Sequence, residues 1–184
     1  MAGMTEEIER QWFAVDKWVV DRAEADLVCS AVLTLLRPRI NLVFVDAYSD
    51  FHDSLSDEAA EAERWLLAKG ALQRRWDSGI TVQLDPTDND HWAVLLRYAP
   101  WSINVDLCAN SDPKAIATLH DCAGSVTAYL TPDEAANLAE TVAAVAPVLP
   151  LDLLHARRRS ERAAARSACH AERRSRIAKL FRRF

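Results

Sequence analysis

The chain has 184 residues, half of them apolar, and its 22 Lys and Arg against 27 Asp and Glu give a formal net charge of −5. This composition excludes a disordered polyelectrolyte, and only 4 Gly and 7 Pro exclude collagen-like and low-complexity chains. The longest predominantly apolar run, 27–36, is 10 residues long and includes Ser30 and Thr34, whereas a membrane-spanning helix needs about 20. We therefore expect no transmembrane segment. The length predicts one domain, to which a short additional segment can be attached.

The beginning of the chain and its cysteines indicate the compartment. The first ten residues hold three Glu and lack the apolar core of a secretory signal. The four cysteines are scattered, without any C-x-x-C pair. We expect a cytoplasmic protein with free thiols, because disulfides are rare in reducing compartments.

The first half of the chain predicts two helices separated by a strand. Apolar residues at 3-4 spacing, among them Trp12, Val15 and Val19, predict a helix over 6–36 that ends before Pro38. The pattern blurs near 21–26, so two helices with a break there are the alternative. A short apolar run over 40–48 predicts a buried strand. Apolar positions at helical spacing then predict a second helix over 56–76.

From residue 79 the pattern changes to that of short strands. Runs over 80–84 and 92–98 flank a turn-rich stretch at 85–90, and further runs follow at 102–107, 115–120 and 126–130. The sequence Thr131-Pro132-Asp133-Glu134 has the order of a helix start with a capping box, and the helix it predicts stops before Pro147. Together these elements predict an α+β fold, an antiparallel sheet meander covered by helices, with a basic C-terminal helix.

Charge divides the chain into two unequal parts. Residues 1–150 carry 11 basic and 24 acidic side chains, a net of −13, whereas residues 151–184 carry 11 basic and 3 acidic, a net of +8. Pro147 and Pro150 stand at this change, and proline does not fit inside a regular helix. The sequence therefore predicts an acidic globular domain over 1–147 and a basic helical tail over 148–184.

The segment Asp46 to Asp53 invites a metal hypothesis. Asp46, Asp50 and Asp53 offer the oxygen ligands of hard divalent cations, with His52 beside them. In Asp46, Ala47 and Asp50 the segment resembles the D-A-H-x-D stretch of arginase-like manganese hydrolases. Tyr48 replaces the ligand histidine of that family, so we interpret the segment as an acidic loop and expect no metal site. We likewise expect no cofactor and no catalytic residues, because the chain has no nucleophile elbow and no phosphate-binding loop.

Two tryptophans outside the predicted apolar stripes have two interpretations. Trp18 and Trp101 are either exposed aromatic anchors for a partner, a role in which Trp is enriched, or a small core beneath a loop.

The tail has the strongest signature for function. It is rich in Ala and Arg, contains no Gly or Pro after Pro150, and has Ile177, Leu180, Phe181 and Phe184 at helical spacing near its end. Its basic side chains are candidate contacts to nucleic acid: Arg157, Arg158, Arg159, Arg162, Arg166, Arg173, Arg174, Arg176, Lys179, Arg182 and Arg183. The four apolar residues near the end are candidates for docking to a partner.

These features predict a non-catalytic accessory or regulatory protein that binds nucleic acid or a ribonucleoprotein through its basic C-terminal helix. The first alternative is a protein-interaction module whose tail docks on an acidic partner or a second copy. A membrane surface is a third possible target of the tail. The enzyme alternative, a metal-dependent hydrolase, depends on the Asp46–Asp53 loop alone.

Overall fold

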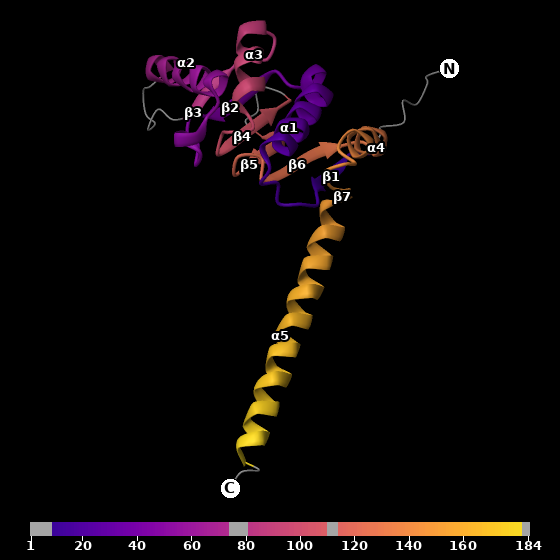
Figure 1. Cartoon of the computed structure of the whole chain (residues 1–184). Helices are drawn as coiled ribbons and strands as arrows, with labels where there is room; N and C mark the ends of the chain where they lie inside the picture. Colours follow the sequence, from indigo (N-terminus) through magenta and orange to yellow (C-terminus); the bar gives the residue numbers. More distant parts are fainter. Residues whose placement is uncertain (1–8, 74–80, 110–113, 182–184) are drawn as a thin grey trace, which may run out of the picture.

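A seven-stranded antiparallel sheet in the order β3-β2-β4-β5-β6-β1-β7 forms the centre of the molecule (Figure 1). The computed structural model describes residues 9–73, 81–109 and 114–181, and side chains in these ranges except at 71–73 and 167–181. The strands are β1 (Gln11–Val15), β2 (Leu42–Asp46), β3 (Thr81–Leu84), β4 (Asn104–Cys108), β5 (Ala115–His120), β6 (Ser125–Leu130) and β7 (Val148–Pro150). The helices are α1 (Arg22–Leu36), α2 (Asp57–Gln73), α3 (Asn89–Tyr98), α4 (Pro132–Thr141) and α5 (Leu151–Phe181), with short 3-10 turns at Arg37–Arg39 and His52–Ser54. The fold is α+β, as predicted.

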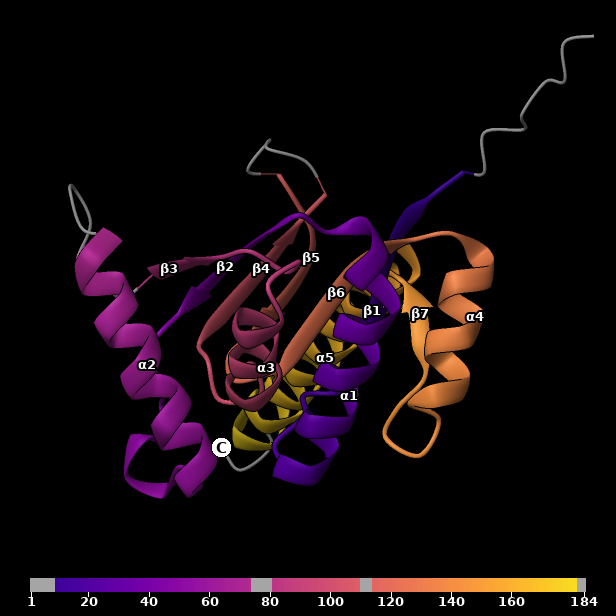
Figure 2. The same cartoon turned by 90° about the horizontal axis from the view of Figure 1, so that it is seen from above.

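The two faces of the sheet have different surroundings. Helices α1, α2 and α3 lie over one face, with α4 beside α1, and α5 leaves on the opposite side (Figures 1 and 2). Successive strand side chains point to opposite faces, so Val43, Val105 and Leu119 enter the helix-covered core and are fully buried. On the other face Phe44, Asp106 and their neighbours are only half-buried. An antiparallel sheet tolerates such an open face.

Several predicted elements are confirmed, because local signals define their ends. At α4 the Thr131 hydroxyl accepts the backbone N–H of Glu134 at 3.2 Å, and a Glu134 carboxylate oxygen accepts the N–H of Thr131 at 2.8 Å. This is the capping box that the sequence predicts. The strands β2 to β6 and the helix α2 lie within a few residues of their predicted ranges, and β4, β5 and β6 form a consecutive meander. The predicted end of α2 at Trp76 lies outside the described residues.

Two segments have a different secondary structure from the predicted one. Residues 11–15, predicted as helix, form β1, because they pair with both β6 and β7. Residues 92–98, predicted as a strand, belong to α3, whose first turn is capped by the Asp88 carboxylate through the N–H groups of Asp90 and His91. A short apolar run fits both the helical period of about 3.6 residues and the strand period of 2. The pairing with β6 and β7 makes residues 11–15 a strand, and the Asp88 cap starts the helix at residues 89–98. The predicted start of the first helix, at residues 6–8, lies outside the described residues.

The last strand lies beyond the predicted domain boundary. Val148 to Pro150, which were predicted to belong to the tail, form β7 and pair with β1. Proline is tolerated here because β7 is an edge strand. The division of the chain at residue 147 stays a prediction. In the structure, the strand β7, which follows this residue in the chain, is still part of the sheet.

Two further observations concern thiols and membranes. Cys29, Cys108 and Cys122 are buried and form no disulfide. Burial raises the pKa of the Cys29 thiol, so this cysteine is an inert core residue. In the described part of the chain, no helix has the length and apolar character needed to cross a membrane.

Candidate nucleic-acid interface

The base of α5 is fixed on the sheet. Leu154 is buried, and an Arg157 Nη2 atom donates to Asp16 Oδ1 at 2.6 Å, just after the end of β1. The hydrogen bond from Arg157 to Asp16 raises the pKa of the guanidinium above its ordinary value. Arg157, predicted to contact nucleic acid, therefore attaches α5 to the body in this structure.

Beyond this anchor α5 leaves the body, and we call residues 158–181 the arm. Figure 1 shows it as a single straight helix that runs away from the sheet. Every residue from 155 to 166 is exposed. The arm thus extends into solvent instead of lying along the acidic surface of its own body.

Four of the predicted arginines form one face of the arm. At about 100° per residue, Arg158, Arg159, Arg162 and Arg166 lie within an arc of about 100°, and we call them the basic stripe. Leu154 and Arg157 lie outside this arc, on the side that faces β1. No arginine of the basic stripe forms an ion pair with any residue that the structure describes, whereas Arg157 also lies 3.4 Å from Glu161. The stripe is therefore available to an external polyanion.

The remaining predicted site residues lie toward the end of the arm. Arg173, Arg174, Arg176, Lys179, Ile177, Leu180 and Phe181 fall on the helical backbone of α5, in the part where side chains are not described. Arg182, Arg183 and Phe184 lie outside the described residues. Their predicted roles stay predictions.

The acidic side chains of the loop 46–53, on which the metal hypothesis depends, do not gather at one point. Asp46 Oδ1 accepts the hydroxyl of Thr81 at 2.6 Å, and Asp50 and Asp53 are exposed. Among the residues with described side chains, no three His, Cys, Asp or Glu gather as a potential metal site. His52 faces α2 instead of these aspartates.

Sequence reasoning missed a buried carboxylate on α2. Glu63 is only 5% exposed, accepts the Tyr98 hydroxyl at 2.9 Å, and lies 3.0 Å from Nδ1 of the exposed His52. The available signal was its place between Ala62 and Leu66, two apolar positions of the predicted stripe. A buried carboxylate needs hydrogen-bond donors; Tyr98 of α3 supplies one, and His52 of the loop after β2 lies within ion-pair distance.

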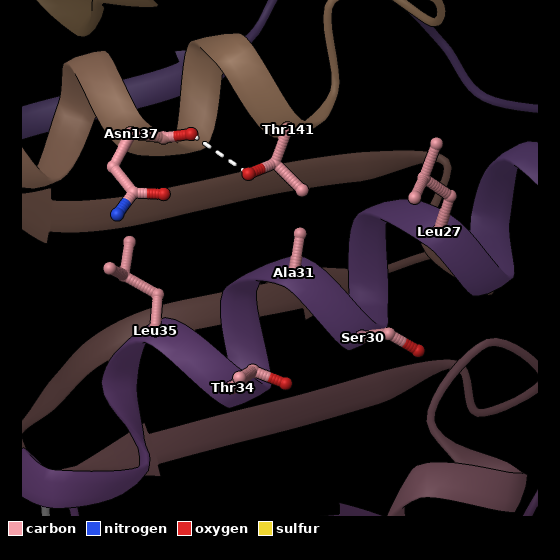
Figure 3. A pocket seen from close by; sticks show the side chains of 7 residues that line it. All are labelled: Leu27, Ser30, Ala31, Thr34, Leu35, Asn137 and Thr141. Atoms are coloured by element: carbon pink, nitrogen blue, oxygen red, sulfur yellow. Dashed lines mark hydrogen bonds between the residues drawn. The ribbon is translucent and has the colours of Figure 1, made fainter.

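A groove of about 540 Å³ runs between α1 and α4 (Figure 3). Leu27, Ala31 and Leu35 of α1 lie opposite Asn137 and Thr141 of α4. The Thr141 hydroxyl is already bonded to the carbonyl of Asn137 at 2.9 Å. The lining contains no charged side chain, so the groove offers no group for acid–base chemistry.

A recess of about 530 Å³ lies where α2 and α3 meet the ends of β2 and β3. Lys69 Nζ lies 2.7 Å from His91 Nε2, and the N–H of Asp85 donates to His91 Nδ1 at 3.2 Å. An Asp88 carboxylate oxygen lies 3.7 Å from the same Nε2 atom. The recess itself is lined by one cation, Lys69, and one carboxylate, Asp85, so it favours neither an anion nor a cation.

Comparison with known proteins adds no assignment to this geometry: no protein-family model, curated protein or solved structure matches the chain.

Proposed function

We propose that this protein is a non-catalytic accessory or regulatory protein that binds nucleic acid, free or in a ribonucleoprotein, through the arm. One observation carries the proposal: the basic stripe is exposed and lies away from the acidic body. Arginine suits this role because its planar guanidinium is always charged and binds phosphate oxygens through two parallel hydrogen bonds.

The spacing of the stripe matches a phosphate backbone. Arg158, Arg162 and Arg166 follow one another at four-residue intervals, and each interval is about 6 Å along a helix. Phosphates on one strand of a duplex are separated by about 3.4 Å along its axis. The stripe therefore presents one positive charge for about every two phosphates of one strand along the duplex axis.

The extension of the arm away from the body also reduces the electrostatic repulsion between the acidic body and a bound nucleic acid. Residues 1–150 carry a net charge of −13, which repels a polyanion at short range. Repulsion between exposed charges is largely screened beyond about 10 Å at ordinary ionic strength. The arm extends for about 35 Å from the anchor at 1.5 Å per residue, so a duplex bound toward its end lies outside this range.

The test is a titration of fluorescent duplex DNA and RNA with the full chain at several salt concentrations. If about 6 arm residues meet phosphates, log affinity falls against log salt with a slope of about −5. Replacing Arg158 and Arg162 by Gln weakens binding and makes the slope less steep by about 2. The matched control replaces Arg64 and Arg97, exposed arginines of the body, by Gln, and leaves both quantities unchanged.

Two results contradict the proposal. One is the absence of binding at about 50 mM salt, where the electrostatic contribution is large. The other is an equal loss of affinity in the arm variant and in the body control. Docking on an acidic protein, the first alternative, then takes its place.

A further inference from the structure

The loops at one end of the sheet expose a group of large apolar side chains. The exposed fractions are 56% for Trp18, 67% for Val20, 50% for Tyr48 and 39% for Phe51, and the partly buried Trp101 lies beside Phe51, with 6.5 Å between ring centres. We call these five residues the apolar patch. They come from the loops after β1, β2 and α3, and exposed apolar groups of this kind mark interaction surfaces.

The patch is held in shape by its own contacts. The Arg22 guanidinium lies 4.6 Å from the centre of the Phe51 ring and 5.5 Å from that of Trp101, and it donates to the carbonyl of Pro100 at 2.7 Å. It also lies 3.4 Å from the carbonyl oxygen of Cys122. The patch is therefore a preorganised surface, which loses little entropy when a partner binds.

A strained turn supports the other side of the patch. Asp121, Cys122 and Ala123 all have positive φ, at 53°, 55° and 63°. The carbonyl of Gly124 accepts the N–H of Val19 at 3.1 Å, and a Cβ at Gly124 would lie 2.9 Å from the Trp18 ring. This close approach fixes the exposed Trp18 ring over the turn.

The surroundings of the patch are acidic. Asp50 and Asp53 are exposed and form no ion pair with any described residue, and Asp21 caps α1 at its edge. The nearby cations are occupied, since Lys17 pairs with Glu24 at 2.6 Å and Arg22 lies between rings. The matching partner carries apolar side chains flanked by positive charge.

The chain itself contains such a segment. Residues 173–184, which we call the tip, hold six basic residues, with Ile177, Leu180, Phe181 and Phe184 at helical spacing among them. The segment lies too far along the arm to return to its own patch without breaking α5. A second copy has no such restriction.

The position of the patch favours this pairing. Asp16, which binds Arg157 at the base of α5, is two residues from Trp18. Figure 1 shows the loop after β1 next to the start of α5. If two arms lie antiparallel around a two-fold axis, each tip therefore arrives at the base of the other arm, near Trp18 of the apolar patch.

We propose that the protein forms a two-fold dimer in which the tip of each arm docks on the apolar patch of the other copy. This proposal does not depend on the proposed nucleic-acid binding. The proposed dimer does affect nucleic-acid binding, because the basic residues of the tip cannot contact phosphates and the acidic residues around the patch at the same time. Nucleic acid and the second copy then compete for the tip, and each weakens the binding of the other.

The experiment measures the mass of the full chain by sedimentation equilibrium between about 1 and 100 μM, without nucleic acid and at low salt. We expect a monomer–dimer equilibrium that added salt weakens. Val20→Glu in the patch and Phe181→Glu in the tip each lower the dimerisation constant more than about tenfold, since each buries a charge in the contact. Val20 is 67% exposed, so its variant folds normally, as circular dichroism verifies.

The matched control is Leu67→Glu, at an apolar residue of α2 that is 39% exposed and lies outside the patch. It leaves the dimerisation constant unchanged. A chain that is monomeric at 100 μM overturns the proposal. A dimer that Phe181→Glu breaks and Val20→Glu does not also overturns it, because the tip then docks elsewhere. The Arg158→Gln and Arg162→Gln variant tests nucleic-acid binding separately, because it leaves patch and tip intact.

Discussion

Helices α1 and α5 contribute to the molecule in opposite ways. α1 has 15 residues, six of them buried, among them Val28, Leu33 and Leu36, each without exposed surface. α5 has 31 residues, and Leu154 is the buried one among those whose side chains are described. Packing thus determines the position of α1, whereas α5 is positioned by its first two turns. Substitutions in α1 should change stability, and substitutions in the arm should change binding.

The sharpest test of this contrast replaces one leucine in each helix. Leu33→Ala removes fully buried methyl groups and leaves a cavity, so we expect the free energy of unfolding to fall by about 3 kcal/mol. Leu153→Ala changes a residue that is 61% exposed, and its effect should stay within about 0.5 kcal/mol. Urea denaturation measures both, and equal effects would show that α5 packs on the body.

Shortened chains locate the end of the body. A chain of residues 1–159 retains β7, Leu154 and Arg157, and should melt cooperatively at close to the temperature of the full chain. A chain of residues 1–147 loses all three, and the burial of Leu154 alone is worth about 2 kcal/mol. Calorimetry compares the two. If they melt at the same temperature, the predicted boundary at residue 147 is the thermodynamic one.

Tyr98→Phe tests the polar contact inside the body. The variant leaves a carboxylate oxygen of the buried Glu63 without its hydroxyl donor, which should cost about 1 to 2 kcal/mol. Burial, and then the bond to Glu63, raise the pKa of Tyr98. Because the folded pKa is raised, the stabilisation is complete below the unfolded pKa of about 10 and decreases as the pH rises above it.

The control for this variant is Tyr129→Phe. Tyr129 is 36% exposed, so we expect little change in stability. Unfolding curves between pH 8 and 11 compare the two variants. Tyr98→Phe should unfold with a smaller alkaline loss than the parent chain, and an unchanged loss would contradict the assignment to Tyr98.

The smallest effect concerns the cap of α3. Hydrogen bonds from the N–H groups of His91 and Asp90 hold the pKa of Asp88 below its ordinary value. The stabilisation is therefore present above the unfolded pKa of about 3.9 and decreases as the pH falls below it. Asp88→Asn keeps the cap and should remove this pH dependence, whereas Asp88→Ala removes the cap and lowers the melting temperature at pH 7. Melting curves at pH 3 and pH 7 distinguish the two.

The elements whose signals are local could be predicted from the amino-acid sequence. The capping box at Thr131 and Glu134 defined the start of α4 without any tertiary contact. The meander of β4, β5 and β6 followed from short runs separated by short loops. The opposite charges of residues 1–150 and 151–184 are also plain in the sequence, and they predict that the basic end of the chain binds a partner.

The elements and surfaces that depend on partners distant in the chain are defined only in the folded molecule. Trp12 and Val15 fit the spacing of a helix, yet pairing with β6 and β7, more than 100 residues away in the chain, makes residues 11–15 a strand. The exposure of Trp18 likewise depends on the turn at Gly124. The direction of the arm depends on Asp16 and Arg157, which are 141 residues apart. Local propensity describes a segment, whereas its pairing partners, its exposed face and its direction are set by the burial of the whole chain.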